Sequence, residues 1–395
     1  PSETPTRLLT RISFGVIITG DEDGDGARAG DADDTTPDST GADATPNDGG
    51  AASTGDDSGP TPIGAKLGST RTVLQYVRDG GVETVRTLTC LAEYEDALTG
   101  EAKVMFGEQA AREYPDRVRY MLRSGLPEGD ESVGLAATFF EEVVDSEGLD
   151  SDSAVVYAIP TIDNEPGLRN LERVIEDSPV GDALVRSFHE SLCGSIPALG
   201  DDLEAIDEVF VAVNMGSTNL EASAFRNGEQ LSPFVSGAVT GNEVDRNIAN
   251  AVEEETQGRV NIDLTTAREY KEEHADFEGF EPFTDVIQQP GGGAHEFTIE
   301  RSVMEPLDEY VDSAVDEVAN NFLSQLASEH MKPYQLALSA PIVLTGGMAC
   351  IPGIVDVFEE RLSAELDRDV TCTAADRPDL AAAEGARRIA GRLTE

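Results

Sequence analysis

Residues 66–71 read Lys-Leu-Gly-Ser-Thr-Arg, and residues 214–219 read Asn-Met-Gly-Ser-Thr-Asn. The Gly-Ser-Thr triplet therefore recurs far along the chain, and each copy lies between two runs rich in β-forming residues. A β-hairpin with this tip can point backbone N–H groups and two hydroxyls into one concavity, and glycine lets an oxygen atom approach without a clash at Cβ. Two such hairpins facing each other would bind a polyphosphate from both sides.

A single Gly-Ser-Thr triplet is also a common tight turn, so neither copy alone identifies a phosphate site. A third motif adds to the pair. The run from Ile342 to Met348 contains Gly346-Gly347, and it is followed by Ile351-Pro352-Gly353 and an amphipathic helix that begins at Ile354. A strand, a glycine pair and a helix in this order bring backbone close to a nucleotide. The three motifs together favour nucleotide binding.

The order of predicted elements indicates an α/β fold. Strand-like runs occupy residues 73–77, 155–159 and 209–213, and they alternate with helical patterns. Apolar residues recur at helical spacing over 307–322 and 354–366. About 330 residues follow the first 61, which exceeds the usual single hydrophobic core, so two domains are expected.

The stretch from Ile342 to Leu362 resembles the adenosine motif of actin-like ATPases of the actin and MreB superfamily, and the two Gly-Ser-Thr hairpins resemble the phosphate loops of that family. The resemblance covers nearly all of residues 63–395. It implies an actin-like two-domain fold, made of duplicated RNase H-like domains with a nucleotide cleft between them. With its acidic, lysine-poor composition, the chain most resembles haloarchaeal actin homologues of the salactin and volactin type, which form dynamic cytoplasmic filaments.

The resemblance also implies boundaries. Residues 21–60 contain no Val, Ile, Leu, Met or aromatic residue, so this segment cannot bury enough apolar area to offset its ordering entropy. The expected parts are a disordered acidic extension (1–61), domain I (62–205) with a small subdomain (about 90–150) and a first connecting helix (about 187–197), domain II (206–375), and a second connecting helix (376–395).

The family's functional positions can be carried over one by one. Residues 241–245 and 265–272 resemble the segments that contact ribose and adenine, and Glu190 aligns with the residue that positions the attacking water. The expected phosphate-binding residues are Lys66, Gly68, Ser69, Thr70, Asn214, Gly216, Ser217 and Thr218. The expected ribose and adenine contacts are Gly241, Glu243, Lys271, Glu272, Gly346, Gly347 and Met348.

Two positions depart from the family pattern. An aspartate usually begins each phosphate loop and organises the water shell of Mg²⁺, but Lys66 and Asn214 stand there in this chain. Asn214 can still contact a metal-bound water, whereas an ammonium cannot, so Lys66 is expected to touch phosphate oxygens. No direct protein ligand to Mg²⁺ is expected, and ATP hydrolysis is expected to be slow. On composition alone, Lys66 also fits an exposed strand-end lysine, and Glu190 one surface acid among many.

The charge of the chain limits its partners. With 28 basic and 77 acidic side chains its formal charge is −49, which excludes direct binding to nucleic acid or to an anionic membrane. Only four basic residues are lysines, a composition that indicates a surface adapted to strong salt, and the fold is expected to lose compactness below about 1 M salt. The scattered cysteines indicate a reduced cytoplasmic protein without structural zinc.

The leading hypothesis is a filament-forming, actin-like protein that binds ATP or GTP with Mg²⁺ in the cleft, polymerises with itself, and disassembles on slow hydrolysis. A small-molecule kinase of the same superfamily is the enzyme alternative, although no convincing substrate base stands out among the acids. A nucleotide-binding scaffold that does not hydrolyse is the third. The sequence decides neither between ATP and GTP nor which adaptor or cargo the filament carries.

Overall fold

The computed structural model describes residues 59–200, 203–288 and 293–395, and most of the predicted acidic extension lies outside these ranges. The first half of the chain is built on a five-stranded sheet with strand order β10-β9-β1-β2-β3. Strands β1, β2 and β3 form an antiparallel meander, and β9 and β10 add to β1 in parallel. The strands are β1 (Thr61–Leu67), β2 (Arg71–Arg78), β3 (Gly81–Leu88), β9 (Ser153–Ile159) and β10 (Leu184–His189).

The second half repeats this topology. Its sheet has the order β13-β12-β11-β16-β17, again with an antiparallel meander followed by parallel strands. The strands are β11 (Val209–Met215), β12 (Leu220–Arg226), β13 (Glu229–Ser236), β16 (Ile342–Thr345) and β17 (Cys372–Ala374). The three predicted strand runs are thereby confirmed in β2, β9 and β11, and both Gly-Ser-Thr triplets join equivalent strands.

Each sheet has its own hydrophobic core because apolar strand residues meet apolar helix faces. In the first half, Ile63 and Val155 pack with Phe139 and Phe140 of α2. Gly148 follows the last residue of α2 and caps the helix with a φ of 58°, which suits glycine. The helices of this half are α1 (Gly107–Glu113), α2 (Gly129–Glu147) and α3 (Glu165–Glu176). Residues of about 90–150 are expected to form a small subdomain. In the structure this segment is split, because α2 packs in the main core whereas another part of the segment projects from it.

The core of the second half gathers the predicted amphipathic helices. Leu307 and Phe322 pack with Leu344 and Phe358. The pattern over 307–322 folds as α7 followed by a π-helical turn, and the pattern from Ile354 folds as α10. The helices of this half are α5 (Gly241–Glu255), α6 (Leu264–His274), α7 (Met304–Asp316), η2 (Glu317–Leu323), α8 (Ser324–Glu329), α9 (Met331–Ala337), η3 (Gly347–Cys350) and α10 (Ile354–Glu365).

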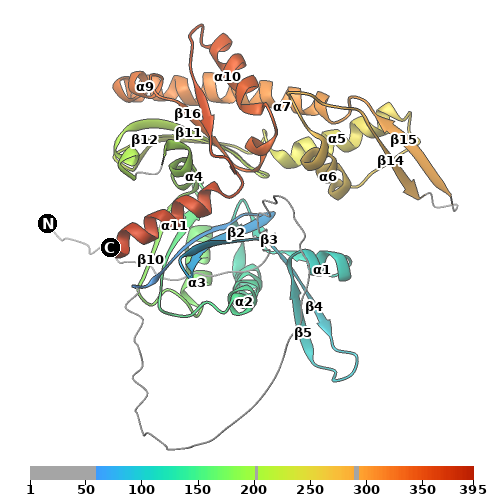
Figure 1. Cartoon of the computed structure of the whole chain (residues 1–395). Helices are drawn as coiled ribbons and strands as arrows, with labels where there is room; N and C mark the ends of the chain where they lie inside the picture. The colour runs from blue at the N-terminus through green and yellow to red at the C-terminus, as the bar shows by residue number, and fades with distance from the viewer. Residues whose placement is uncertain (1–58, 201–202, 289–292) are drawn as a thin grey trace, which may run out of the picture.

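Two helices cross between the sheets (Figure 1). Helix α4 (Glu190–Leu199) follows the first sheet but packs on β11 and β16 of the second, whereas α11 (Ala381–Thr394) follows the second sheet and packs on β1 and β9 of the first. They touch where Gly385 meets the carbonyl of Cys193, so closely that a Cβ at Gly385 would lie 1.9 Å from that oxygen. A short helix, η1 (Leu203–Asp207), leads from α4 into β11.

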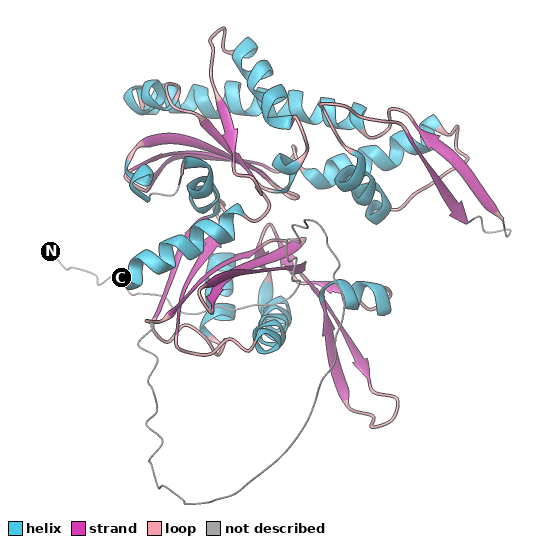
Figure 2. Ribbon diagram, viewed as in Figure 1, coloured by secondary structure: helices cyan, strands magenta, loops and turns pink. Residues whose placement is uncertain are grey.

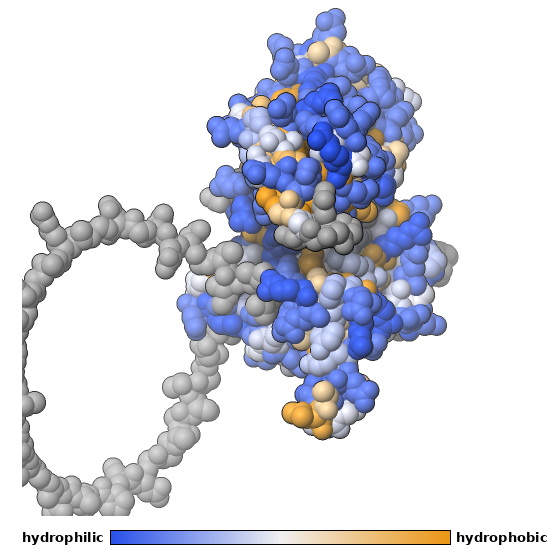
Figure 3. Space-filling view, turned by 90° about the vertical axis from the view of Figure 1, so that its right-hand side faces the viewer, coloured by the Kyte–Doolittle hydropathy of each residue, from blue (hydrophilic) through white to orange (hydrophobic). Residues whose placement is uncertain are grey.

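Two hairpins project from the body (Figure 2). They are β4 (Cys90–Glu95) with β5 (Ala102–Phe106) in the first half, and β14 (Phe283–Gln288) with β15 (Ala294–Ile299) in the second. The short strands β6 (Arg119–Tyr120), β7 (Leu122–Arg123) and β8 (Leu126–Pro127) lie closer to the first core, where Leu122 and Leu126 are buried. Figure 3 shows a largely hydrophilic surface with apolar residues at the tip of the lower projection. Within the described ranges, no helix combines the length and apolarity that a membrane crossing requires.

Candidate functional site

The tips of the two Gly-Ser-Thr hairpins meet between the halves. In the first hairpin (β1–β2), the Gly68 N–H donates to the carbonyl of Arg71 at 3.0 Å; in the second (β11–β12), the Gly216 N–H donates to the carbonyl of Asn219 at 2.9 Å. A Cβ at either glycine would lie within 3.0 Å of the same carbonyl, so both turns require glycine. Thr70 Oγ1 donates to Ser217 Oγ across the gap at 3.1 Å.

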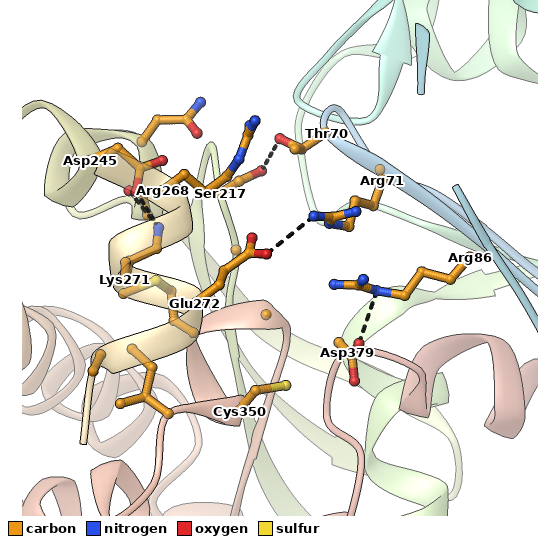
Figure 4. Close-up of a pocket in the computed structure, with 18 of the residues that line it drawn as sticks. Thr70, Arg71, Arg86, Ser217, Asp245, Arg268, Lys271, Glu272, Cys350 and Asp379 are labelled. Atoms are coloured by element: carbon orange, nitrogen blue, oxygen red, sulfur yellow. Dashed lines mark hydrogen bonds and ion pairs between the residues drawn. The ribbon is translucent and has the colours of Figure 1, made fainter. Parts of the chain in front are cut away.

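A pocket of about 330 Å³ opens beside these tips (Figure 4). Its walls come from both halves: the first hairpin and β3 on one side, and the second hairpin, α5, α6 and η3 on the other. The N-terminus of α5 is fixed against the second hairpin, because the N–H groups of Gly241 and Asn242 donate to the carbonyls of Gly216 and Ser217. The three sequence motifs therefore line one cavity.

The pocket is electrostatically unlike the rest of the molecule. Six basic side chains line it, from Lys66, Arg71, Arg86, Arg268, Lys271 and Arg377, against three acidic ones, from Asp245, Glu272 and Asp379. In the whole chain, acids outnumber bases by 77 to 28. A concentration of cations in an acidic protein makes this pocket suited to an anionic ligand.

Lys66 and Glu190 meet at the point where the hairpins converge. Lys66 Nζ lies 2.7 Å from Glu190 Oε1 at the start of α4, and both side chains are largely buried. Asn214 Nδ2 donates to the same oxygen at 3.0 Å, while Asn214 Oδ1 is buried and accepts no hydrogen bond from the residues that the structure describes. Burial lowers the pKa of Lys66, but the Glu190 carboxylate outweighs burial, so the pKa is raised and the ammonium stays charged.

Glu221 adds a second carboxyl group to this cluster. It lies opposite Asn214 in the second hairpin, is 3% exposed, and accepts a hydrogen bond from the Thr161 N–H of the first half at 3.0 Å. Burial, reinforced by the nearby Glu190 charge, raises the pKa of Glu221 to about 8.

The opposite end of the pocket is formed by α5, α6 and η3. Lys271 Nζ pairs with Asp245 at 2.5 Å and donates to the Gly241 carbonyl at 3.2 Å. Gly346 has a φ of 90°, and a Cβ there would lie 2.5 Å from Asn214 Oδ1, so the glycine pair lets this loop pack against the second hairpin.

Ion pairs link the two halves over the pocket (Figure 4). Arg71 of the first half contacts Glu272 of α6 at 3.1 Å and Glu108 of α1 at 3.2 Å. Arg86 on β3 contacts Asp379, which precedes α11, at 3.1 Å. Burial raises the pKa of Asp379, but Arg377 and Arg86 outweigh burial and lower it, so this carboxylate is charged.

The structure brings most of the predicted site residues together. The pocket lining includes Lys66, Gly68, Thr70, Gly216, Ser217, Gly241, Lys271, Glu272, Gly347 and Met348. Six predicted residues are outside the lining. Three of them adjoin it: Glu190 contacts Lys66 of the lining, Asn214 contacts Glu190, and Gly346 packs against Asn214. The other three lie elsewhere. Ser69 Oγ accepts the Gly125 N–H, Glu243 pairs with Arg246 on an outer face of α5, and Thr218 follows the second tip.

Sequence reasoning missed the arginines of the pocket. Arg71 directly follows the first triplet, and Arg268 lies within the predicted adenine segment, so both were within reach of the motif analysis. Arg86 pairs with Val73 in the β2–β3 register, which becomes visible only once the strands are aligned. Asp379 lies within the segment expected as the second connecting helix (376–395), for which no site residue is predicted.

The residues here do not fit a protein-held Mg²⁺. Within the described ranges, no group of three His, Cys, Asp or Glu side chains is placed to bind a metal ion. At the phosphate end, Lys66 and Asn214 both bond to the Glu190 oxygen, which leaves Asn214 Oδ1 as a neutral acceptor. An amide oxygen beside an ammonium suits contact with a metal-bound water rather than direct coordination.

Comparison with known proteins agrees with this geometry. A family model described as Salactin matches residues 60–394. Salactin from Halobacterium salinarum is 65% identical over 333 residues, which cover 84% of this chain and 92% of that protein.

Solved structures with a similar fold are more distant in sequence. Crystal structures of MreB5 of Spiroplasma citri bound to AMPPNP and to ADP are 15% identical, have a TM-score of 0.67, and match 85% of this chain and 97% of theirs. A MamK double helical filament is 18% identical, with a TM-score of 0.64 over 83% of this chain and 98% of its own. The predicted actin-like fold is confirmed.

Proposed function

This chain belongs to the salactin family of actin-like cytoskeletal proteins, and from that premise we propose that it binds ATP or GTP between its halves and polymerises with itself into filaments. The cationic pocket in an otherwise acidic chain is the observation that carries this proposal. The relatives bound to AMPPNP and ADP and the MamK filament add support.

The two sets of motifs would contact different parts of the nucleotide. The hairpin tips and Lys66 would hold the phosphates, with Gly68 and Gly216 allowing close approach, and α5, α6 and η3 would hold ribose and base. A phosphate entering between the tips has to replace the bond between Thr70 and Ser217. We take residues 62–205 and 206–375 as the two domains, because each sheet lies within one of these ranges apart from Thr61 at the start of β1, and residues 376–395 as the segment that returns to the first.

Mg²⁺ enters this proposal as a companion of the nucleotide. The metal would be held by phosphate and water oxygens, with Asn214 Oδ1 facing its water shell. It would neutralise phosphate charge. No residue at this point of the pocket needs to coordinate it directly.

Hydrolysis would be slow. Glu190 has the carboxylate that can orient an attacking water, but Lys66 and Asn214 stand where the family's aspartates organise the water shell of Mg²⁺. The same replacement favours a second candidate, a filament scaffold that binds nucleotide without hydrolysing it. Measurement of phosphate release during assembly separates the two, because only the first candidate releases phosphate.

We propose that the chain associates with copies of itself and that it does so in the cytoplasm. The adaptor that such a filament would use is not identified. The formal charge of −49 opposes direct contact with nucleic acid or anionic lipid. The four cysteines are free, which supports a reducing compartment.

The test is calorimetric titration of ATP and GTP into the purified chain in multimolar KCl, followed by pelleting and electron microscopy. Substitution of Arg86 by Ala removes a pocket cation and should weaken nucleotide binding about tenfold. Substitution of Arg123 by Ala is the matched control, because this arginine is 80% exposed and lies outside the pocket lining. Folded protein that binds neither nucleotide, or that forms no filaments with either, would overturn the proposal.

A further inference from the structure

Lys66 differs from the other lysine of the pocket in how it is held. Lys271 bonds to a carboxylate and a carbonyl that both belong to its own half. Lys66, on the first hairpin, has Glu190 of α4 as its one recorded ion-pair partner among the described residues, and that carboxylate also accepts the amide of Asn214 from the second hairpin. A cation, a carboxylate and an amide from three elements thus meet where the hairpins converge.

We propose that Lys66 leaves Glu190 for the nucleotide phosphates when nucleotide binds, and that this exchange makes nucleotide binding independent of divalent metal. The inference rests on the proposed function and specifies how the phosphate end of that site works. It makes Lys66 the counter-ion of the phosphates and Glu190 its resting partner.

The exchange follows from the charges and the geometry. A lysine ammonium is a mobile point charge with three N–H donors on a flexible stem, so it can turn between neighbouring acceptors. A triphosphate carries more negative charge than one carboxylate and offers several oxygens to the same ammonium. Glu190 keeps the Asn214 amide after Lys66 leaves, so its carboxylate retains a hydrogen-bond donor.

The side chains at the phosphate end of the pocket explain why we expect nucleotide binding to be independent of divalent metal. A divalent ion strengthens phosphate binding when protein carboxylates hold it, directly or through water. Here the Glu190 carboxylate beside Asn214 is bound to an ammonium, and Asn214 Oδ1 is a neutral amide oxygen. The positive charge that a metal would supply at this point already belongs to the chain.

The first experiment needs no variant. ATP is titrated into wild-type protein in multimolar KCl, once with MgCl₂ and once with EDTA, and the Kd is measured by calorimetry. We expect the two values to agree within about threefold. A Kd that weakens by more than about tenfold in EDTA overturns the exchange while leaving the proposed function intact. Absence of ATP binding in both conditions overturns both.

Variants then test the exchange itself. Glu190→Gln keeps the oxygen that accepts from Asn214 but removes the charge that competes for Lys66, so ATP should bind about tenfold more tightly in EDTA. If the ion pair were only structural, the same variant would bind ATP equally or more weakly, and that result would overturn the proposal.

Lys66→Met should weaken ATP binding at least tenfold, with and without Mg²⁺. Lys103→Met is its matched control, because Lys103 forms an ion pair of the same 2.7 Å length with Asp96 outside the pocket lining. Circular dichroism and thermal melting check that each variant is folded. Equal ATP affinity of Lys66→Met and Lys103→Met would contradict the exchange, whichever way Glu190→Gln behaves.

Discussion

The buried position of Glu221 makes ionisation of its carboxyl group unfavourable. Its side chain is buried in the second hairpin, close to Glu190, and its pKa is raised to about 8 from an ordinary value of 4.5. The folded state therefore holds this proton more tightly than the unfolded state does. Glu221 contributes most to stability at acidic pH, and this contribution is lost as pH rises through its folded pKa.

Substitution of Glu221 by Gln should remove that pH dependence. The amide can still accept the Thr161 N–H, but it cannot ionise. We expect the variant to match wild type near pH 5 and to become more stable than wild type as pH rises from about 5 to 8, by several degrees in Tm. Melting curves of both proteins across this pH range, at constant multimolar KCl, measure the difference. A constant difference in Tm at every pH would refute the assignment.

At the scale of single residues, the sequence predicts turn chemistry better than charge placement. Gly68 and Gly216 are recognisable because a tight turn beside a ligand needs glycine wherever it occurs. Arg86 reaches the pocket through strand register, and Glu221 has a raised pKa through burial, and neither property can be read from neighbouring residues. Of the six predicted residues outside the lining, Ser69, Thr218 and Glu243 do not adjoin it. All three are polar, and a local hydrogen bond or ion pair holds Ser69 and Glu243 elsewhere.

At the scale of elements, the crossing of α4 and α11 depends on one glycine. A Cβ at Gly385 would lie 1.9 Å from the Cys193 carbonyl oxygen, so alanine there must push the two helices apart. We expect Gly385→Ala to lower the free energy of unfolding by about 1–3 kcal/mol. Denaturant unfolding in multimolar KCl measures the loss.

Gly391 in the same helix provides the matched control. A Cβ there would meet Pro62 at 3.9 Å, an ordinary contact, so Gly391→Ala changes helix propensity without overpacking. This variant should be as stable as wild type or more stable by up to about 1 kcal/mol. Similar losses in both variants would mean that the helix crossing tolerates a wider separation than the geometry indicates.

The tip of the β4–β5 hairpin carries an apolar residue that is almost fully exposed to solvent. Leu98 at its tip is 96% exposed, on a surface that is otherwise mostly hydrophilic (Figure 3). We expect the proposed filament to bury this side chain between subunits, because burial of an exposed leucine removes apolar surface from water. Leu98→Asp should raise the critical concentration for assembly about tenfold while leaving ATP binding unchanged. Pelleting across protein concentrations tests this, with Leu264→Asp on another exposed surface as the control.

Helices and strands were the most predictable level of the structure. Apolar residues at regular spacing located β2, β9, β11 and α10, because periodicity reports which face is buried. The π-helical turn that follows α7 has no such signal, since helical spacing continues through it. The place of α2 in the main core also depends on tertiary packing rather than on its own sequence.

For the whole molecule, charge sets the conditions of the proposed assembly. Subunits with a formal charge of −49 repel one another, and at about 1 M salt the Debye length falls to about 3 Å, which screens that repulsion. We expect the critical concentration to rise steeply as KCl is lowered, before the fold loses compactness below about 1 M salt. Light scattering and circular dichroism over one KCl series measure both. Assembly that persists after the fold is lost, or a critical concentration that does not change with KCl, would contradict this expectation.

The crossed packing of α4 and α11 also bears on how the chain can be divided. Each half carries the helix that covers the other half's sheet, so a cut between α4 and β11 would not release two independent pieces. Two fragments expressed separately would each expose an apolar sheet face and lack the helix to cover it. Expressed together, each fragment would supply the helix that the other lacks, and the two would reassemble. The extent of reassembly would measure the stability of the interface between the halves.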